Sequence, residues 1–240
     1  MELLEVKNVT KRFGGLVALN SVNLAIKRGE ILGLIGPNGA GKTTLFNCIT
    51  GFYRPESGDI FFAEGKITGL TPHEVATMGI ARTFQVVRAF HSMTVHDSVT
   101  TGALCRAKDI AEAKPKVMKI LEFSGLVKKK DIPARSLTIV DRKRLGLASA
   151  LATEPKLLLL DEVVAGLNPV EVEEVIGLLR RIRQSGVTLF VVEHVMRLIM
   201  SVADRIIVLH HGEKIAEGKP VEVTENKKVI EAYLGERYVA

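Results

Sequence analysis

The sequence predicts an α/β protein with a mostly parallel β-sheet, an antiparallel β unit at the N-terminus and an inserted α-helical subdomain. Three observations support this prediction. Apolar and polar residues alternate near the start, a glycine-rich turn follows a continuous apolar run, and strand-length apolar runs later alternate with helical segments. We expect a single domain over 1–240, with a core formed by 1–85 and 154–240 and the helical subdomain at 86–153.

The N-terminal elements follow from their hydrophobic patterns. Residues 4–9 and 22–26 each have one polar and one apolar face, so we expect two strands that pair antiparallel. Residues 30–35 are apolar almost throughout, which is typical of a strand buried on both faces. The glycine-rich turn then leads into a helix over 42–49, with Gly51 as its C-cap.

The middle of the chain changes from strands to helices. The runs 59–62 and 66–67 predict a hairpin, and Thr71 followed by Pro72 predicts the start of a helix. From about residue 95 to residue 153 the alternation typical of strands is absent and helical periodicity replaces it. We therefore expect the helical subdomain here.

The last third of the chain alternates strands with helices, which predicts right-handed crossovers and a parallel sheet. A short hairpin strand and a final amphipathic helix are expected after it. The expected strands are 157–160, 188–192, 205–209 and 214–217, and the expected helices are 169–184, 195–201 and 229–234.

Composition excludes several classes of protein. No apolar run approaches the ~20 residues of a membrane span, and the start of the chain lacks the pattern of a signal peptide. Cys48 and Cys105 are expected to be reduced thiols rather than a disulfide. The net charge is +6, but the basic residues are spread along the chain, with three Tyr and no Trp, so no nucleic-acid-binding surface is expected. We expect a cytoplasmic protein.

A phosphate-binding loop is the strongest motif. It follows the buried strand at 30–35 and precedes a helix, which is the context that such a loop requires. Its glycines let backbone N–H groups turn toward an anion, Lys42 would reach the terminal phosphates, and the Thr43 hydroxyl would bind Mg²⁺. A turn without a ligand would not need three glycines, a lysine and a hydroxyl together. The expected nucleotide-binding residues of the loop are Gly36, Pro37, Asn38, Gly39, Ala40, Gly41, Lys42, Thr43 and Thr44.

Two carboxylates follow the apolar strand expected at 157–160. Ligands of open α/β sheets bind at the carboxyl ends of the strands, where these side chains would lie. Asp161 would hold Mg²⁺ directly or through water, and Glu162 would orient and deprotonate the attacking water. Beside a phosphate loop, this pair predicts hydrolysis of a nucleotide.

The order and spacing of further residues resemble the ATP-binding subunits of ABC transporters over essentially the whole chain. The resemblance implies a phosphate-loop NTPase core and an ATPase with ATP and Mg²⁺ as cofactors. It implies that Gln85 contacts the metal and the nucleotide and couples to a membrane partner, and that His194 is a catalytic residue at the γ-phosphate. Phe13 lies where the family stacks an aromatic ring on adenine, with packing in the core as the alternative.

Four segments, 79–85, 93–95, 165–169 and 232–236, resemble the ATPases of branched-chain amino-acid uptake systems. Asn168 replaces the aspartate of most ABC proteins, a substitution that this subfamily shares. The resemblance implies a location at the cytoplasmic face of the membrane and three kinds of partner. These are a second ABC ATPase subunit, identical or related, two transmembrane permease subunits, and indirectly an external substrate-binding protein.

Two other functions stay open at this point. The ATPase of a lipopolysaccharide or other exporter would carry the same cassette, although 79–85 and the tail favour amino-acid import. A soluble ABC ATPase of translation or DNA repair usually carries two cassettes or a long coiled coil, whereas this chain has one cassette and no sustained heptads.

One stretch departs from the family pattern. The Leu-Ser-Gly-Gly-Gln sequence that closes over the partner's ATP falls at 137–141, where both glycines are absent. Thr138 and Asp141 suit a capping box, so we expect the helix to start normally. We also expect the β-branched Ile139 and Val140 and the charge of Asp141 to oppose close approach to phosphate.

Overall fold

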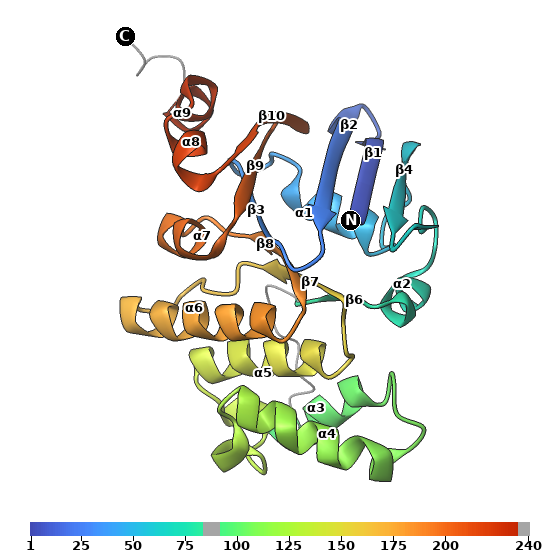
Figure 1. Ribbon diagram of the computed structural model, residues 1–240, viewed down its shortest axis with the longest axis vertical. Helices are drawn as coiled ribbons and strands as arrows, with labels where there is room; N and C mark the ends of the chain where they lie inside the picture. The colour runs from blue at the N-terminus through green and yellow to red at the C-terminus, as the bar shows by residue number, and fades with distance from the viewer. Residues whose placement is uncertain (84–91, 235–240) are drawn as a thin grey trace.

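The described residues of this computed structural model, 1–83 and 92–234, form two β-sheets and a separate group of helices (Figure 1). The predicted α/β fold is confirmed. The four-stranded sheet has the order β2-β1-β4-β5, with β1 (Glu2–Phe13), β2 (Leu16–Lys27), β4 (Ser57–Phe62) and β5 (Gly65–Lys66). The six-stranded sheet has the order β10-β9-β3-β8-β7-β6, with β3 (Ile31–Ile35), β6 (Ile80–Arg82), β7 (Leu157–Asp161), β8 (Thr188–Val192), β9 (Arg205–His210) and β10 (Glu213–Gly218).

The four-stranded sheet is antiparallel, as predicted, but its first two strands are longer than their sequence pattern indicates. β1 and β2 span 12 residues each and pair with several register shifts. Asn8, at φ +51°, lies at one of these irregularities. Beyond Val9 the polar run 10–12 no longer alternates, and the sequence pattern therefore ends before the strand does.

The six-stranded sheet is parallel from β9 through β3, β8 and β7 to β6, and β10 adds to β9 in the antiparallel sense. Every residue of β3, β7 and β8 is buried, which explains their continuous apolar runs. The three-residue strand β6 was not predicted because it is too short to show a period. Its residues Ile80 and Ala81 are buried on opposite faces of the sheet, in two different hydrophobic clusters.

Helices cover both sheets, and most begin at a residue that caps them well. Thr71 and Asn168 form capping boxes with Glu74 and Glu171. The C-cap of the first helix is Thr50, and Gly51, at φ +77°, is the next residue rather than the C-cap itself. The helices beside the sheets are α1 (Lys42–Ile49), α2 (Pro72–Met78), α6 (Pro169–Gln184), α7 (Met196–Val202), α8 (Pro220–Thr224) and α9 (Lys227–Leu234). Within 1–83 and 92–234 no helix is both long enough and apolar enough to cross a bilayer.

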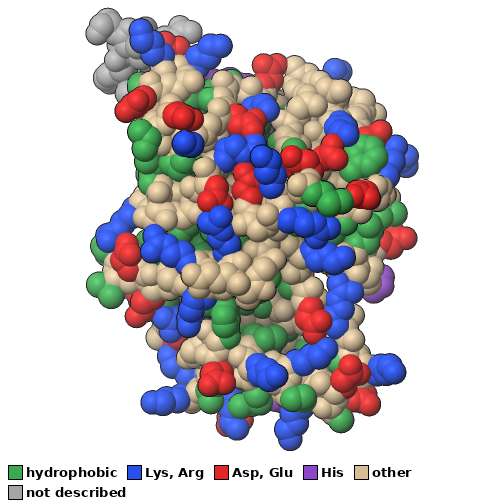
Figure 2. Space-filling model, viewed as in Figure 1, with side chains coloured by type: hydrophobic (Ala, Val, Ile, Leu, Met, Phe, Trp, Pro, Cys, Tyr) green, Lys and Arg blue, Asp and Glu red, His purple; other side chains and the backbone are tan. Residues whose placement is uncertain are grey.

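A second group of helices lies at one end of the molecule and has a hydrophobic cluster of its own (Figure 1). It consists of α3 (Val95–Ala103), α4 (Ile110–Phe123), α5 (Ile139–Leu151) and the 3₁₀ turns Val127–Lys129 and Ala134–Ser136. Helix α5 belongs to two clusters. Its residues Leu145 and Ala148 pack in the helical cluster, whereas Leu147 and Ala150 pack in the cluster of the central sheet. On the face shown in Figure 2, basic and acidic side chains are interspersed rather than gathered in one basic patch.

Candidate functional site

The predicted phosphate loop connects β3 to α1 and is shaped by close backbone contacts. Gly36 has φ +152°, and a Cβ atom there would lie 2.1 Å from the carbonyl oxygen of Leu209. Gly41 has φ +104°, and a Cβ atom there would lie 2.5 Å from the carbonyl oxygen of Ala18. Any other residue would push the loop away from β9 and β2, so the loop requires glycine at both positions.

The remaining predicted loop residues surround the start of α1. Asn38, Gly39 and Thr43 are exposed, whereas Ala40 is buried and accepts a hydrogen bond from Gly212 N–H. The others, Pro37 and Thr44, are half-buried. The exposed residues therefore lie on the side of the loop that a ligand can reach.

Lys42, the first residue of α1, lies with its amine over this loop. Its Nζ donates hydrogen bonds to the carbonyl oxygens of Gly36, at 2.6 Å, and Pro37, at 3.0 Å. Burial lowers the pKa of the amine below its ordinary value, while the carboxylates of Glu162 and Asp161 act in the opposite direction. The positive charge of the loop and the two predicted acidic residues thus belong to one site.

Asp161 ends β7 and is nearly buried. Its Oδ2 lies 2.7 Å from Nη2 of Arg82, and its N–H donates to the hydroxyl oxygen of Thr83 at 3.3 Å. Arg82 also donates from Nη1 to Oδ1 of Asn47 on α1, at 2.5 Å. No role was predicted for Arg82, although a basic residue directly after the apolar pair Ile80 and Ala81 was a signal that could have indicated one.

Glu162 follows in a left-handed backbone conformation, at φ +49°. Its N–H donates to the carbonyl oxygen of Val192, and its own carbonyl oxygen accepts from Nζ of Lys143 at 2.9 Å. Its Oε1 lies 3.8 Å from Nδ1 of His194, which is mostly exposed after β8. The structure therefore brings together the residue expected to activate the attacking water, Glu162, and the residue expected at the γ-phosphate, His194.

Glu193 is a buried carboxylate that the sequence analysis did not single out. Its Oε1 accepts from Val164 N–H at 2.9 Å, and its Oε2 accepts from His194 N–H at 3.3 Å. Burial raises the pKa of Glu193, against these hydrogen bonds. Glu193 therefore joins the turn that follows Glu162 to the end of β8. In the sequence, a carboxylate between the apolar strand residues 191–192 and a histidine was the signal that could have indicated this role.

Phe13 lies on the surface rather than in the core, with 43% of its area exposed. Its ring makes an edge contact with Tyr53, with centroids 5.2 Å apart, and the Lys11 ammonium lies 5.2 Å from its centroid. The core-packing alternative for Phe13 is therefore wrong. Gln85, the remaining predicted contact to metal and nucleotide, lies outside the described residues.

Comparison with known proteins identifies the chain. Residues 19–165 match the family described as ABC transporter. The chain belongs to this family, and the prediction of a transport ATPase with an ATP-binding cassette is confirmed. Residues 213–239 also match the family described as branched-chain amino acid ATP-binding cassette transporter.

Full-length relatives agree with this assignment. The branched-chain amino acid transport ATP-binding protein LivG of Escherichia coli is 42% identical, and BraF of Pseudomonas aeruginosa is 40% identical, each with 98% of both chains covered. The lipopolysaccharide export protein LptB of Acidithiobacillus ferridurans is 33% identical, with 99% of this chain and 98% of that protein covered. The crystal structure of the ADP conformation of MJ1267, an ATP-binding cassette of an ABC transporter, has a TM-score of 0.91 at 33% identity, covering 98% of this chain and 100% of the other.

The stretch that stands in place of the ABC signature glycines begins α5. Thr138 caps the helix and accepts from Asp141 N–H, as predicted. The carboxylate of Asp141 is buried, accepts from the Thr138 hydroxyl at 2.7 Å and pairs with Lys129, so its charge is partly neutralised within the chain. Burial raises the pKa of Asp141, but its hydrogen bonds outweigh that effect and the pKa lies below its ordinary value. Ile139 is 51% exposed. The apolar side chains of Ile139 and Val140, rather than the charge of Asp141, are therefore what replaces the two glycines at the surface.

The C-terminal tail of this ABC cassette reaches the phosphate loop. Tyr233 on α9 is 47% exposed; partial burial raises the pKa of its phenol, while the nearby backbone of Gly36 acts in the opposite direction. The sequence analysis used this tail only as a family signature.

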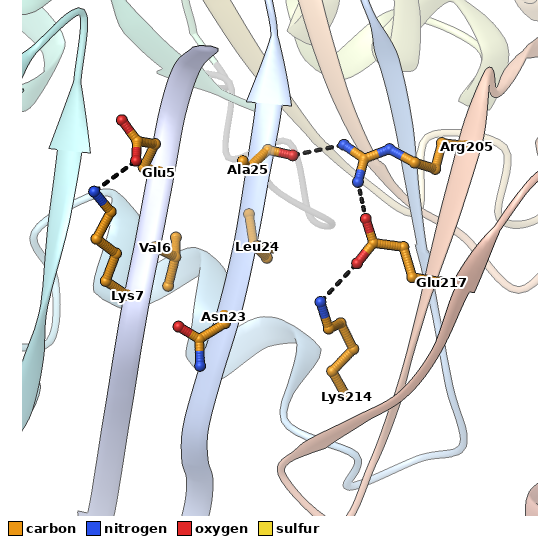
Figure 3. A pocket seen from close by; sticks show the side chains of 9 residues that line it. All are labelled: Glu5, Val6, Lys7, Asn23, Leu24, Ala25, Arg205, Lys214 and Glu217. Atoms are coloured by element: carbon orange, nitrogen blue, oxygen red, sulfur yellow. Dashed lines mark hydrogen bonds and ion pairs between the residues drawn. The ribbon is translucent and has the colours of Figure 1, made fainter.

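A groove beside β2, β9 and β10 is separate from the phosphate loop (Figure 3). Its charged groups bind one another: Glu217 pairs with Arg205 and Lys214, and Glu5 pairs with Lys7. Arg205 also donates to the carbonyl oxygen of Ala25 at 2.6 Å. Of these contacts, the bond from Arg205 to Ala25 joins the edge of one sheet to the other.

Proposed function

We propose that this chain is the ATP-hydrolysing subunit of an importer for branched-chain amino acids, acting at the cytoplasmic face of the membrane. The relatives at 42% and 40% identity are named for that transport, and the match of the tail is to the same group. The observation that carries the catalytic part of the proposal is the arrangement of Lys42 over the phosphate loop, with Asp161 and Glu162 acting on its pKa.

Nucleotide binding would use the two ends of this site. The exposed ring of Phe13 is available to stack on adenine. Backbone N–H groups of 36–44 and the N-terminus of α1 would hold the phosphates. Lys42 would exchange its bonds to the carbonyls of Gly36 and Pro37 for bonds to the terminal phosphates, which are stronger acceptors.

The donor set fits Mg²⁺, which prefers hard oxygen ligands. The Thr43 hydroxyl is exposed at the first turn of α1, and the Asp161 carboxylate is fixed at the end of β7 through its Oδ2. We assign Gln85 as a further contact. When bound, the metal supplies positive charge to the terminal phosphates of ATP.

Hydrolysis would follow from the position of Glu162 and His194. Glu162 accepts a proton from the attacking water, whose oxygen bonds to the γ-phosphorus as the bond to the β-phosphate oxygen breaks, releasing ADP and phosphate. His194, 3.8 Å from that carboxylate, orients the γ-phosphate. Lys42 stabilises the charge on the phosphates throughout.

The proposed assembly contains a second ABC ATPase subunit, two permease subunits and an external binding protein. We assign 1–85 and 154–240 to the nucleotide-binding core and 86–153 to a helical subdomain that transmits motion to the permeases. The separate hydrophobic cluster of α3, α4 and α5 supports this division.

The test is reconstitution of the chain with its partners in proteoliposomes. We expect leucine, isoleucine or valine with the binding protein to stimulate ATP hydrolysis and to be taken up. The same preparation with Glu162→Gln is the control and should show neither effect. Stimulation by lipopolysaccharide instead would assign the chain to an exporter.

A further inference from the structure

A buried arginine side chain links two parts of the proposed site. Arg82 and Asp161 have side chains only 7% and 9% exposed, and they form an ion pair of 2.7 Å. The same guanidinium binds Oδ1 of Asn47 at 2.5 Å and lies 5.5 Å from the centroid of Phe46. One cation thus contacts the helix of the phosphate loop and the carboxylate assigned to the metal.

The sheet explains why these groups meet. β6 pairs in parallel with β7, with Arg82 opposite Leu159. Because side chains alternate between faces, Arg82 shares a face with Ile80, and Asp161 shares a face with Leu159. Ile80, Leu159 and Phe46 belong to one hydrophobic cluster, so both charged side chains extend along the face that α1 covers. A three-residue strand at this edge is enough to place the guanidinium.

Building on the proposed function, we propose that Arg82 is a positioning residue that orients the Asp161 carboxylate and lowers its affinity for Mg²⁺ until ATP is bound. A carboxylate already paired with a guanidinium attracts a second cation less strongly. A metal ion alone would have to share Asp161 with Arg82, whereas ATP adds phosphate ligands of its own.

The experiment measures metal binding without nucleotide. Binding of Mn²⁺ to the full chain is followed by electron paramagnetic resonance, and thermal unfolding is followed against MgCl₂ concentration. We expect Arg82→Met to bind Mn²⁺ at least about tenfold more tightly than the wild type, and to regain with MgCl₂ the thermal stability that it loses without metal. Arg82→Lys, which keeps the charge, should lie close to the wild type in both measurements.

Two controls separate the proposal from a structural role. Arg106→Met removes an arginine that binds the carbonyl oxygens of Thr77 and Thr153, and it should lower stability without any response to metal. The double variant Arg82→Met/Asp161→Asn leaves no buried charge of this pair and should not respond to metal either. If Arg82→Met alone is too unstable to fold, Arg82→Gln replaces that single variant, and the double variant serves as the folded comparison.

Unchanged Mn²⁺ affinity in Arg82→Met or Arg82→Gln would overturn the proposal. A metal response that persists in the double variant would show that the ion does not bind at Asp161, which would remove the metal assignment itself. Neither result depends on transport, so failure of the amino-acid import proposal is recognised separately, by the reconstitution experiment.

Discussion

At the scale of single residues, the site depends on where charges are held. Lys42 occupies the phosphate loop, Asp161 is paired with Arg82, and Glu162 faces His194. Each charge has a polar partner in the protein, so the site is ordered by its own side chains and backbone. A ligand that binds here would have to replace some of these contacts.

Lys42→Ala should reduce ATP hydrolysis by at least about a hundredfold, because it removes a charged donor aimed at the developing phosphate charge. Steady-state hydrolysis and binding of labelled ATP would measure the loss. Lys66→Ala is the matched control, since Lys66 pairs with Asp59 on the surface. Normal turnover of Lys42→Ala would contradict the assignment of the loop.

The two cysteines should differ in reactivity. Burial raises the pKa of the Cys48 thiol to about 12, whereas Cys105 is exposed. At pH 8 a thiolate-specific reagent should therefore modify one thiol of the native chain rapidly, and Cys105→Ala should abolish that fast phase while Cys48→Ala keeps it. The unfolded chain releases the Cys48 proton more readily, so this thiol lowers native stability as the pH rises from the ordinary thiol range toward 12. Rapid modification of Cys48 would contradict its burial.

At the scale of elements, the predictions succeeded where a whole strand or helix carries one pattern. β3, β7 and β8 are buried throughout and were predicted from continuous apolar runs. The ends of β1 and β2 and the whole of β6 were missed, because polar residues or shortness hide their period. The capping of α5 was predicted, but the ion pair between Asp141 and Lys129 was not, since it depends on packing between turns 12 residues apart.

Lys143→Met should slow hydrolysis about tenfold or more, because a hydrogen bond from a charged donor contributes about 1.5–3 kcal/mol and here it holds the main chain of Glu162. Burial lowers the pKa of Lys143, with the nearby Glu193, Glu162 and Asp161 opposing that effect. Single-turnover hydrolysis of bound ATP is the measurement. Lys119→Met, on the exposed face of α4, is the control and should be neutral.

The start of α5 allows a direct test of the missing glycines. Ile139→Gly/Val140→Gly should raise ATP hydrolysis by the purified chain and cost about 1 kcal/mol of stability per glycine. Asp141 stays unchanged in this variant, because the structure shows that it is buried and paired. Val170→Gly, at the equivalent position of α6, controls for helix stability. No rise, with wild-type activity already normal, would show that the apolar side chains are tolerated.

At the scale of the whole molecule, the order of motifs along the chain identified the family, and the fold explains why. The phosphate loop, Asp161 and Glu162 with His194 follow three adjacent strands, β3, β7 and β8, at one edge of the sheet. The cluster around Arg82 was not predicted, because it joins residues that only the folded chain brings close.

Glu162→Gln should keep ATP binding and slow hydrolysis by about 10²- to 10⁴-fold, because the geometry remains while the base is lost. With its natural partner subunit and ATP, the variant should then elute from gel filtration as a stable dimer. Glu174→Gln, a surface residue paired with Arg144, is the control. Only monomer in the presence of the partner and ATP would contradict the proposed pairing with a second ATPase subunit.

Helix α5 packs in two hydrophobic clusters and also carries Lys143, which binds the backbone of Glu162. Turning of the helical group against the sheet would therefore displace the main chain at Glu162. Thermodynamic linkage makes such an effect reciprocal. A protein that binds the helical group and changes the affinity for nucleotide by some factor must itself be bound more tightly or more weakly, by that same factor, when nucleotide is present.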